Sequence, residues 1–368
     1  MDNKVIDPWK GTEIKDYKRI MAEFGIEDMS KLVDQLPVKN PYFFRGVIFG
    51  HKDFKVILDA VKNKKPFVMM TGLMPSGRFH IGHKIIADLM VYFQELGAEC
   101  YICVADIESY LTRNISLEEG RNVAIEEYLL NYIASGLKPS KTRFYFQSEG
   151  SKNYMNLSKF IAGRTTFNEL KAIYGDLTPQ KIVSAFTQVA DILHPQLKEN
   201  GGPKPVVVPV GVDQLPHLNL CRDIAGRMRE YKFVSPSAIF TKLIPGLKGI
   251  HTKMSSSDPD SAIFLTDDER TVENKIKKYA FSGGQASLEE HRKKGGNPDV
   301  DVSFQYLKLL FEPDDKKLDK IYNDYKSGKL LTSELKEILI EKINKFLKIH
   351  RANREKAKKM LDKFIIKN

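Results

Sequence analysis

Two histidines three positions apart, His80 and His83, are the first residues of this 368-residue chain whose types and spacing suit chemistry. Residues 67–70 are an apolar run of strand length, and residues 84–96 carry apolar side chains at helical spacing. The histidines should therefore lie at a helix N-terminus, where unpaired N–H groups and the helix dipole favour an anion such as a triphosphate. We expect both imidazoles to donate to phosphate oxygens, while Gly82 lets a flat base or ribose approach the backbone.

Such a histidine pair has two other readings. An isolated His-x-x-His is more often two ordinary surface residues, and it can also belong to a metal site. The glutamate of a zinc-protease helix is missing, and the three cysteines of the chain lie elsewhere. We therefore assign no metal ligands, and the phosphate reading depends on a second motif.

That second motif lies about 170 residues further along, where residues 253–257 read KMSSS. Glycines, serines and a proline predict that residues 245–260 form a mobile loop. Lys253 can place a compact positive charge on phosphates while serine hydroxyls and N–H groups hold the rest. A loop that closes only around a transition state contributes to rate rather than to ground-state binding. Alone the run is typical of a solvated loop, but beside the histidine motif it indicates catalysis.

Strand-like and helix-like segments alternate through the middle of the chain, and these must position the two motifs. Thr166 and Glu169 offer a capping box for one of the helices. Alternation of this kind is typical of an α/β fold with a parallel sheet covered on both faces. Ligands of such sheets lie at the carboxyl ends of the strands, where the loop at residues 75–83 falls. The predicted strands are 101–105, 143–146 and 205–210, and the predicted helices are 116–135, 178–193 and 213–229.

The chain divides into three parts. Residues 1–65 form an N-terminal extension, residues 66–295 an α/β catalytic domain that includes the loop at 245–260, and residues 296–368 a helical C-terminal domain. The second boundary lies where glycines and a proline interrupt regular structure, because the pattern from residue 302 onward is purely helical.

A formal net charge of +11 points to a polyanionic partner. From residue 342 to the end, the chain has ten Lys or Arg and only two acidic residues, and apolar residues recur at helical spacing. This predicts an amphipathic helix whose basic outer face positions RNA phosphates, although a merely solvated face fits the pattern equally well.

Composition also bounds the compartment. There is no apolar stretch of membrane-spanning length, and residues 1–4 lack a signal pattern, so we expect a cytoplasmic chain with no membrane partner. Cys100 and Cys103 have redox-motif spacing, but Cys103 falls in an apolar strand pattern. We therefore expect two small buried residues rather than a redox pair.

Together and in this order, the two motifs resemble the nucleotide-binding loops of class I aminoacyl-tRNA synthetases. The resemblance implies a Rossmann-type catalytic domain, a helical anticodon-binding domain and a homodimer. It also implies ATP with Mg²⁺, activation of an amino acid, and transfer to the tRNA 3′ end. His80, His83 and Lys253 would be the catalytic residues. The implied ATP-binding residues are Pro75, Ser76, Gly77, His80, Gly82, His83, Lys253, Met254, Ser255 and Ser256.

Further strings narrow the resemblance. Residues 208–214 read VPVGVDQ, which is similar to a block shared by tryptophanyl- and tyrosyl-tRNA synthetases. Residues 258–267 read DPDSAIFLTD, and residues 281–303 contain FSGG, EEHR, GGN and DVDVS. These strings resemble the tryptophanyl-tRNA synthetases of archaea and eukaryotes, and the similarity covers most of the chain. The implied partners are therefore L-tryptophan, ATP and tRNA(Trp).

The amino-acid pocket departs from that group at two positions, because Met70 and Cys103 stand where its members place a tyrosine and a glutamine. Residues 188–193 read QVADIL and resemble a helix from which bacterial enzymes present an aspartate to the indole. Tryptophan offers one N–H donor and needs a buried acceptor. We predict that Asp191 is that acceptor, with Met70 and Phe186 against the ring. The other predicted amino-acid-binding residues are Thr71, Gly72, Glu108 and Gln188, with Asp213 and Gln214 on the ribose or the substrate ammonium.

Three alternatives stay open. An aspartate also suits a phenol hydroxyl, so tyrosine is the second candidate substrate. A binding protein descended from such an enzyme would hold RNA without catalysis, but both phosphate loops are intact. A nucleotidyltransferase on the same fold would not need the helical C-terminal region and its basic end.

Overall fold

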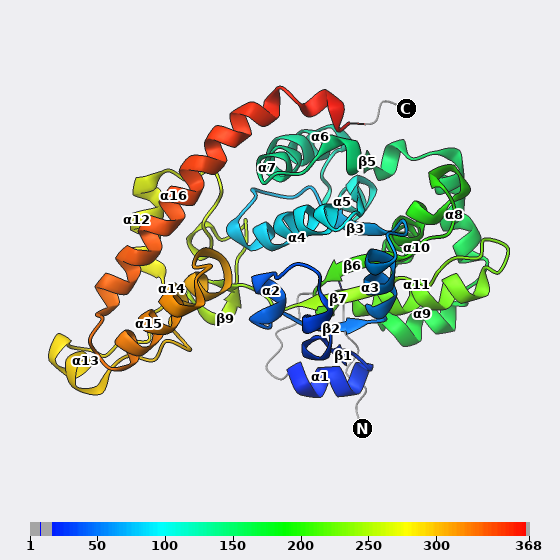
Figure 1. The fold of residues 1–368 in the computed structure, drawn as a ribbon. Helices are drawn as coiled ribbons and strands as arrows, with labels where there is room; N and C mark the ends of the chain where they lie inside the picture. Colours follow the sequence, from blue (N-terminus) through cyan, green and yellow to red (C-terminus); the bar gives the residue numbers. More distant parts are fainter. Residues whose placement is uncertain (1–7, 9–16, 366–368) are drawn as a thin grey trace.

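A seven-stranded sheet with the strand order β1-β2-β7-β6-β3-β4-β5 forms the centre of the computed structural model, which describes residue 8 and residues 17–365 (Figure 1). Strands β3 to β7 run parallel, whereas β2 pairs antiparallel with β7 and β1 with β2. The α/β fold class is confirmed, and so are the strands predicted at residues 67–70, 101–105, 143–146 and 205–210. The strands are β1 (Glu27–Asp28), β2 (Ile48–Lys52), β3 (Val68–Leu73), β4 (Glu99–Val104), β5 (Thr142–Phe146), β6 (Val206–Val210) and β7 (Ser237–Thr241).

Helices cover both faces of this sheet because its side chains alternate between two apolar cores. In β3, Met69 belongs to one core while Val68 and Met70 belong to the other. The first core is closed by α4 (Lys84–Glu95) and α7 (Leu130–Ala134). The second core is closed by α8 (Lys152–Ala162), α9 (Phe167–Tyr174), α10 (Pro179–Leu193) and α11 (Leu215–Arg227).

The remaining helices of the α/β part are short. The capping box at α9 is confirmed, since the N–H of Glu169 donates to Thr166 Oγ1 at 3.3 Å and the N–H of Thr166 donates to Glu169 Oε2 at 2.7 Å. The predicted helix at residues 116–135 is present, but its middle, Ala124–Leu129, is a π-helix. These helices are α1 (Tyr17–Phe24), α2 (Pro41–Phe44), α3 (Lys55–Lys62), α5 (Asp106–Arg113) and α6 (Leu117–Val123).

The C-terminal helices lie to one side of the sheet, and the last of them runs back along α7 (Figure 1). One helix that precedes the predicted domain boundary, α12, packs against α16. The helices of this region are α12 (Glu269–Tyr279), α13 (Leu288–Lys294), α14 (Val302–Tyr306), α15 (Asp315–Lys326) and α16 (Thr332–Lys358), with a second π-helix at Leu307–Phe311.

The predicted mobile loop at residues 245–260 is instead partly ordered as an antiparallel pair, β8 (Pro245–Gly246) and β9 (Gly249–Lys253). The prediction of a loop was wrong for residues 245–253, because the glycines there belong to the tight connection between the two strands. The KMSSS run begins at the last residue of β9 and continues into a turn. Its first residue is therefore carried by a strand end.

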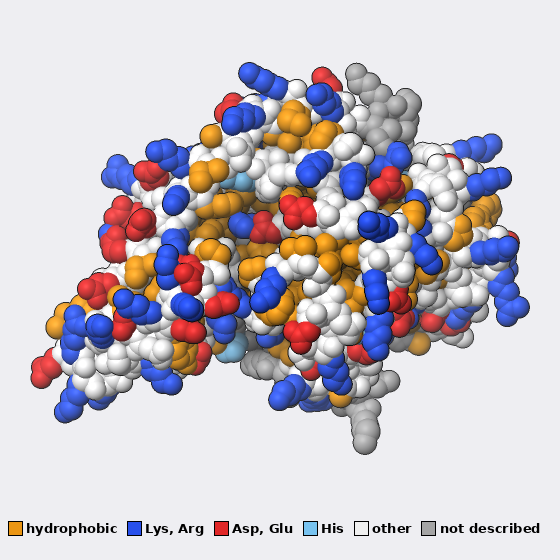
Figure 2. Space-filling view, in the orientation of Figure 1, with side chains coloured by type: hydrophobic (Ala, Val, Ile, Leu, Met, Phe, Trp, Pro, Cys, Tyr) orange, Lys and Arg blue, Asp and Glu red, His pale blue; other side chains and the backbone are white. Residues whose placement is uncertain are grey.

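The basic end of the chain is used in part inside the molecule. Arg351 and Arg354 of α16 donate to the carbonyls of Asp267 and Glu126, and Lys342 pairs with the buried Glu312. Figure 2 shows basic side chains spread over the surface, with acidic ones among them in the helical part. The predicted basic outer face is thus reduced to the lysines of α16 and the residues after it that point to solvent.

Two smaller expectations can be compared with the structure. Cys100, Cys103 and Cys221 are all buried free thiols, as expected for small apolar residues. Among the described residues, no helix combines the length and apolar composition that crossing a membrane requires. The expectation about a signal pattern at residues 1–4 concerns positions outside the described residues.

Candidate active site

The histidine motif forms a single tight turn between β3 and α4. Ile81–His83 is a 3₁₀ turn that runs directly into α4, so the motif lies at a helix N-terminus as predicted. The rings of His80 and His83 stack with centroids 3.8 Å apart and an angle of 18° between their planes. The N–H of His80 donates to Nδ1 of His83 at 3.2 Å, so the proton of His83 is placed on Nε2.

Burial keeps both imidazoles neutral. Loss of solvent lowers the pKa of His80 to about 4, and burial followed by the neighbouring His80 lowers the pKa of His83 well below its usual value. At neutral pH each ring therefore carries one N–H and can act as a hydrogen-bond donor without a full charge. Positive charge for a polyphosphate must come from other residues.

The KMSSS turn brings a lysine close to the histidine turn. The hydroxyl of Ser256 donates to the carbonyl of Arg78 at 2.8 Å, which ties the two motifs together. Met254 is buried with its sulfur facing Gly82, and Lys253 is exposed. Segments separated by about 170 residues in the sequence thus meet at one place.

A cleft of about 550 Å³ lies between these segments. It brings together most of the residues predicted to bind ATP, whereas Pro75 and Gly82 do not line it. Pro75 is buried and faces Gly120 of α6. The lining includes Ser76, Gly77, His80, His83, Lys253, Met254, Ser255 and Ser256, together with Arg113, Tyr128 and Tyr132, which the sequence analysis did not identify.

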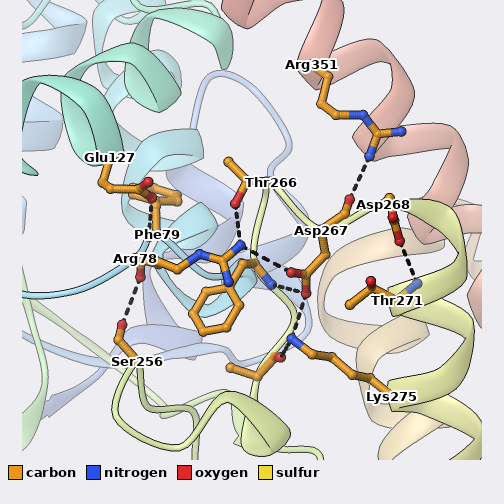
Figure 3. Close-up of polar contacts among 12 residues, drawn as sticks. Arg78, Phe79, Glu127, Ser256, Thr266, Asp267, Asp268, Thr271, Lys275 and Arg351 are labelled. Carbon is orange, nitrogen blue, oxygen red and sulfur yellow. Dashed lines mark hydrogen bonds and ion pairs between the residues drawn. The ribbon is translucent and has the colours of Figure 1, made fainter.

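Arg78 anchors the histidine turn to the segment before α12 (Figure 3). Its guanidinium donates to Thr266 Oγ1 at 2.6 Å and to Asp267 Oδ1 at 3.3 Å, and it lies 4.1 Å from the ring centre of Phe264. On the other side, the N–H of Phe79 donates to Glu127 Oε2 at 3.0 Å. Both contacts fix the backbone that carries His80.

Helices α12 and α16 hold the same segment from behind (Figure 3). Lys275 of α12 donates to Asp267 Oδ2 at 2.7 Å and to the carbonyl of Ala262 at 3.0 Å. Arg351 of α16 donates to the carbonyl of Asp267 at 2.7 Å. The C-terminal helices are therefore connected to the histidine turn through Asp267 and Arg78.

A second cavity, of about 620 Å³, adjoins the cleft at the carboxyl ends of β3, β4 and β6. The two share Arg113 and the wall at Thr71 and Gly72. Of the residues predicted to bind an amino acid, the cavity is lined by Met70, Thr71, Gly72, Glu108, Gln188, Asp191 and Gln214.

Asp213 and Phe186 do not line this cavity. Asp213 lies next to it and accepts from Nε2 of Gln214 at 3.0 Å, so it orients that amide. Gln188 in turn donates to Oε1 of Gln214 at 3.2 Å. Phe186, which is part of α10, packs against the second apolar core.

Asp191 is a buried carboxylate on the wall of the cavity. Tyr154 of α8 donates a short hydrogen bond to Oδ1, and Gln147 donates to Oδ2 at 2.8 Å. Burial raises the pKa of Asp191 to about 6, although the hydrogen bonds from Tyr154 and Gln147 act in the opposite direction. The group is ionised at neutral pH and can accept a further hydrogen bond.

Sequence reasoning did not identify Gln147, Tyr154 or Arg78. Gln147 directly follows β5. It could have been identified from the sequence, because polar residues at the carboxyl ends of parallel strands commonly face the ligand. Tyr154 had no such pattern, because its distance from Asp191 depends on how α8 packs on α10.

Comparison with known proteins shows the family to which the chain belongs. A family profile described as tRNA synthetases class I (W and Y) matches residues 62–348. A tryptophan–tRNA ligase of Methanocaldococcus jannaschii is 43% identical over 98% of this chain and 98% of its own, and one of Aeropyrum pernix is 44% identical over 98% and 97%.

Solved structures show the same fold. The crystal structure of tryptophanyl-tRNA synthetase from Aeropyrum pernix matches with a TM-score of 0.91 at 43% identity, covering 98% of this chain and 99% of that one. The tryptophanyl-tRNA synthetase from Giardia lamblia matches with a TM-score of 0.87 at 30% identity, covering 97% and 99%. The chain belongs to the class I tRNA synthetase family that contains the W and Y enzymes.

Proposed function

We propose that this protein is a tryptophan–tRNA ligase, which activates L-tryptophan with ATP and transfers it to the 3′ end of tRNA(Trp). The observation that carries the proposal is the junction of two cavities. The cleft between the histidine turn and the KMSSS turn opens onto a cavity with a buried carboxylate, Asp191, on its wall. An amino acid in one and a nucleotide in the other would meet at Thr71 and Gly72.

The amino-acid cavity suits an indole. Its volume of about 620 Å³ lies in the range of small-molecule sites, and Met70, Ile192 and Val208 contribute apolar walls. The indole N–H donates but does not accept, and Asp191 provides an acceptor. An amino acid that leaves this acceptor unpaired is rejected at a cost of about 1–3 kcal/mol.

The nucleotide cleft suits the chemistry of adenylation. The tryptophan carboxylate attacks the α-phosphorus of ATP, and pyrophosphate leaves. His80 and His83 donate N–H groups to phosphate oxygens, and Lys253 with Ser255 stabilises the pyrophosphate end. Gly82, outside the cleft lining, leaves room for the His80 ring and the Met254 sulfur. No protein nucleophile takes part, so rate comes from alignment and from charge placed where it develops.

Around the junction, Gln214 is held by Asp213 and Gln188. We assign this set to the ribose or to the substrate ammonium. Glu108, buried at the start of α5, is assigned to the amino-acid side because it lines the same cavity.

Magnesium belongs to the proposal as a companion of ATP. Among residue 8 and residues 17–365, no group of three or more His, Cys, Asp or Glu side chains is arranged to hold a metal ion. Mg²⁺ retains several waters and is commonly held through substrate phosphates, which fits a cleft lined by donors. The ion would reduce phosphate repulsion while the chain positions the polyphosphate.

The rest of the molecule serves tRNA. Residues 296–368 are assigned to anticodon binding, residues 66–295 to catalysis, and residues 1–65 to an extension whose strands β1 and β2 extend the sheet. Exposed lysines of α16, such as Lys345 and Lys348, would position phosphates. We place the enzyme in the cytoplasm as a homodimer, and light scattering should give twice the chain mass.

ATP–pyrophosphate exchange with each of the twenty amino acids tests the proposal. We expect exchange with tryptophan and charging of tRNA(Trp). Exchange with tyrosine instead would overturn the specificity, and no exchange with any amino acid would indicate a binding protein.

A further inference from the structure

The carboxylate of Asp191 is held from two sides by residues of other elements. Tyr154 of α8 donates to Oδ1, and Gln147 at the end of β5 donates to Oδ2 at 2.8 Å. Tyr154 and Gln147 are themselves 2% and 1% exposed, so water does not compete for these bonds. Asp191 thus has a fixed orientation.

Gln147 extends this arrangement to a third element. Its Oε1 accepts the N–H of Glu108 at 3.3 Å, which orients the amide so that Nε2 faces Asp191. The side chain of Gln147 therefore connects Asp191 to the start of α5. Rotation of the carboxylate would break bonds at α8 and β5 together.

We propose that Tyr154 and Gln147 are positioning residues that fix the Asp191 carboxylate with an acceptor position facing the cavity, and that this pair sets selectivity for an aromatic ring carrying an N–H. The proposal rests on the proposed function, since it assigns the cavity to tryptophan. A carboxylate accepts about four hydrogen bonds, so the donors Tyr154 and Gln147, together with the Cys103 thiol, leave capacity for the substrate. Two donors also favour the ionised form, which a donor-only ligand needs.

The side chains that act most strongly on Asp191 are neutral or acidic, while Arg113 lines the same cavity. The groups that act on it are Tyr154 from α8, Gln147 after β5, Cys103 from β4 and Glu108 from α5. Burial raises the pKa of Cys103 and of Tyr154 well above their usual values, so both stay protonated at neutral pH. Glu108 acts on the pKa of Asp191 after burial and the hydrogen bonds, and in the upward direction. The two donors are thus the chief groups that keep the carboxylate charged.

The test compares two ligands of nearly the same shape. Tryptophan and 3-benzothienylalanine differ in that sulfur replaces the indole N–H. For wild type, we expect kcat/KM in ATP–pyrophosphate exchange to favour tryptophan. In Tyr154→Phe the preference should fall about tenfold, the equivalent of one lost hydrogen bond of about 1.4 kcal/mol. The loss should fall on tryptophan and leave the sulfur analogue unchanged.

The pH profile gives a second readout that a merely structural role would not move. The carboxylate must be ionised to accept, so kcat/KM for tryptophan should rise as the pH passes 6. Without the Tyr154 hydroxyl the carboxylate holds its proton more tightly, and this limb should move to higher pH. The sulfur analogue should show no such limb.

Tyr101→Phe is the matched control. Tyr101 lies in the same buried apolar core as Tyr154, and its hydroxyl interacts with Arg143 and Glu99 rather than with Asp191. It should keep both the preference and the limb of wild type. Gln147→Leu removes the other donor and should reproduce the Tyr154→Phe result, which keeps the test decisive if one variant does not fold.

The outcomes separate the two proposals. Wild type without tryptophan-dependent exchange would overturn the proposed function. Wild type that activates tryptophan, with an unchanged preference and an unmoved limb in folded Tyr154→Phe or Gln147→Leu, would overturn the positioning role alone.

Discussion

The backbone of Gly77 lies so close to Ser256 that a methyl group on Gly77 would sit 2.5 Å from the Cβ of Ser256. Gly77 also has a φ of +77°, a region that residues with a side chain rarely adopt. The two motifs therefore lie in close contact at Gly77, which has no side chain to obstruct Ser256.

Gly77→Ala should separate the two motifs. The strained φ alone costs on the order of 1–3 kcal/mol, and the displaced Ser256 adds to it, so adenylation should slow by roughly tenfold or more. Tryptophan binding, which uses the other cavity, should change little. Exchange kinetics and calorimetry measure these effects. Gly226→Ala is the control, because nothing lies within 4 Å of the added methyl. Wild-type ATP kinetics in Gly77→Ala would contradict this account.

Ser256→Ala removes the hydrogen bond to the carbonyl of Arg78 while keeping the loop sequence otherwise intact. A bond of this kind contributes about 1 kcal/mol, so we expect roughly a fivefold lower rate of adenylation. Thr252→Ala serves for comparison, since the Thr252 hydroxyl donates to Gly249 of the same hairpin at 2.8 Å. Equal losses in the two variants would assign the effect to the hairpin rather than to the junction.

Lys253→Ala tests the contribution of one positive charge in the cleft, which Arg113 also lines. His80 and His83 are neutral at neutral pH, so the loss of Lys253 should lower the activation rate by about 10²–10³-fold, as for a missing transition-state donor. Affinity for tryptophan should stay close to wild type in a fluorescence titration. Lys248→Ala removes an equal charge from the same hairpin, where Lys248 pairs with Asp258 at 2.7 Å, and should be nearly silent.

Asp191→Asn should reveal a pH-dependent cost of the buried charge. Burial raises the pKa of Asp191 to about 6 in the folded protein, so its stabilising contribution is present in acid and is lost as the pH rises through 6. An asparagine carries no charge at any pH. The variant should therefore gain about 1–2 kcal/mol on wild type between pH 5 and pH 8 in urea unfolding. A difference that is the same at both pH values would show that Asp191 has an ordinary pKa.

Arg351→Met should loosen the last helix from the active-site segment. The bond from Arg351 to the carbonyl of Asp267 involves a charged donor and contributes about 1.5–3 kcal/mol. Hydrogen exchange in the half of α16 around residue 351 should accelerate by roughly tenfold or more. Lys348→Met, at an exposed position three residues earlier, is the control. Unchanged protection in Arg351→Met would mean that apolar packing alone holds α16.

The sequence was most informative where chemistry is local. His80 to His83 could be placed at a helix start from a strand-length run followed by a helical pattern, and Asp191 from its helix. The contacts made between elements were not readable in the same way. Tyr154 and Asp191 are brought together by packing of α8 on α10, and no spacing rule encodes that distance.

Loop character was the least readable property. Glycines and serines at residues 245–260 suggested mobility, but β8 and β9 pair, with Pro245 opposite Lys253. This pairing depends on the folded chain and is not visible in the local sequence. The basic end of the chain was equally hard to interpret from sequence, because Arg351 and Arg354 donate hydrogen bonds to backbone carbonyls of distant segments.

The π-helix at Ala124–Leu129 has a consequence for how this centre tolerates change in length. It carries Glu127, which binds the N–H of Phe79, and Tyr128, whose ring lies 5.5 Å from that of His83. A π turn holds one residue more than an α turn at the same place. Deleting a single residue there would convert the π turn into an α turn between α6 and α7, and it would change how the contacts of Glu127 and Tyr128 are presented to the histidine turn.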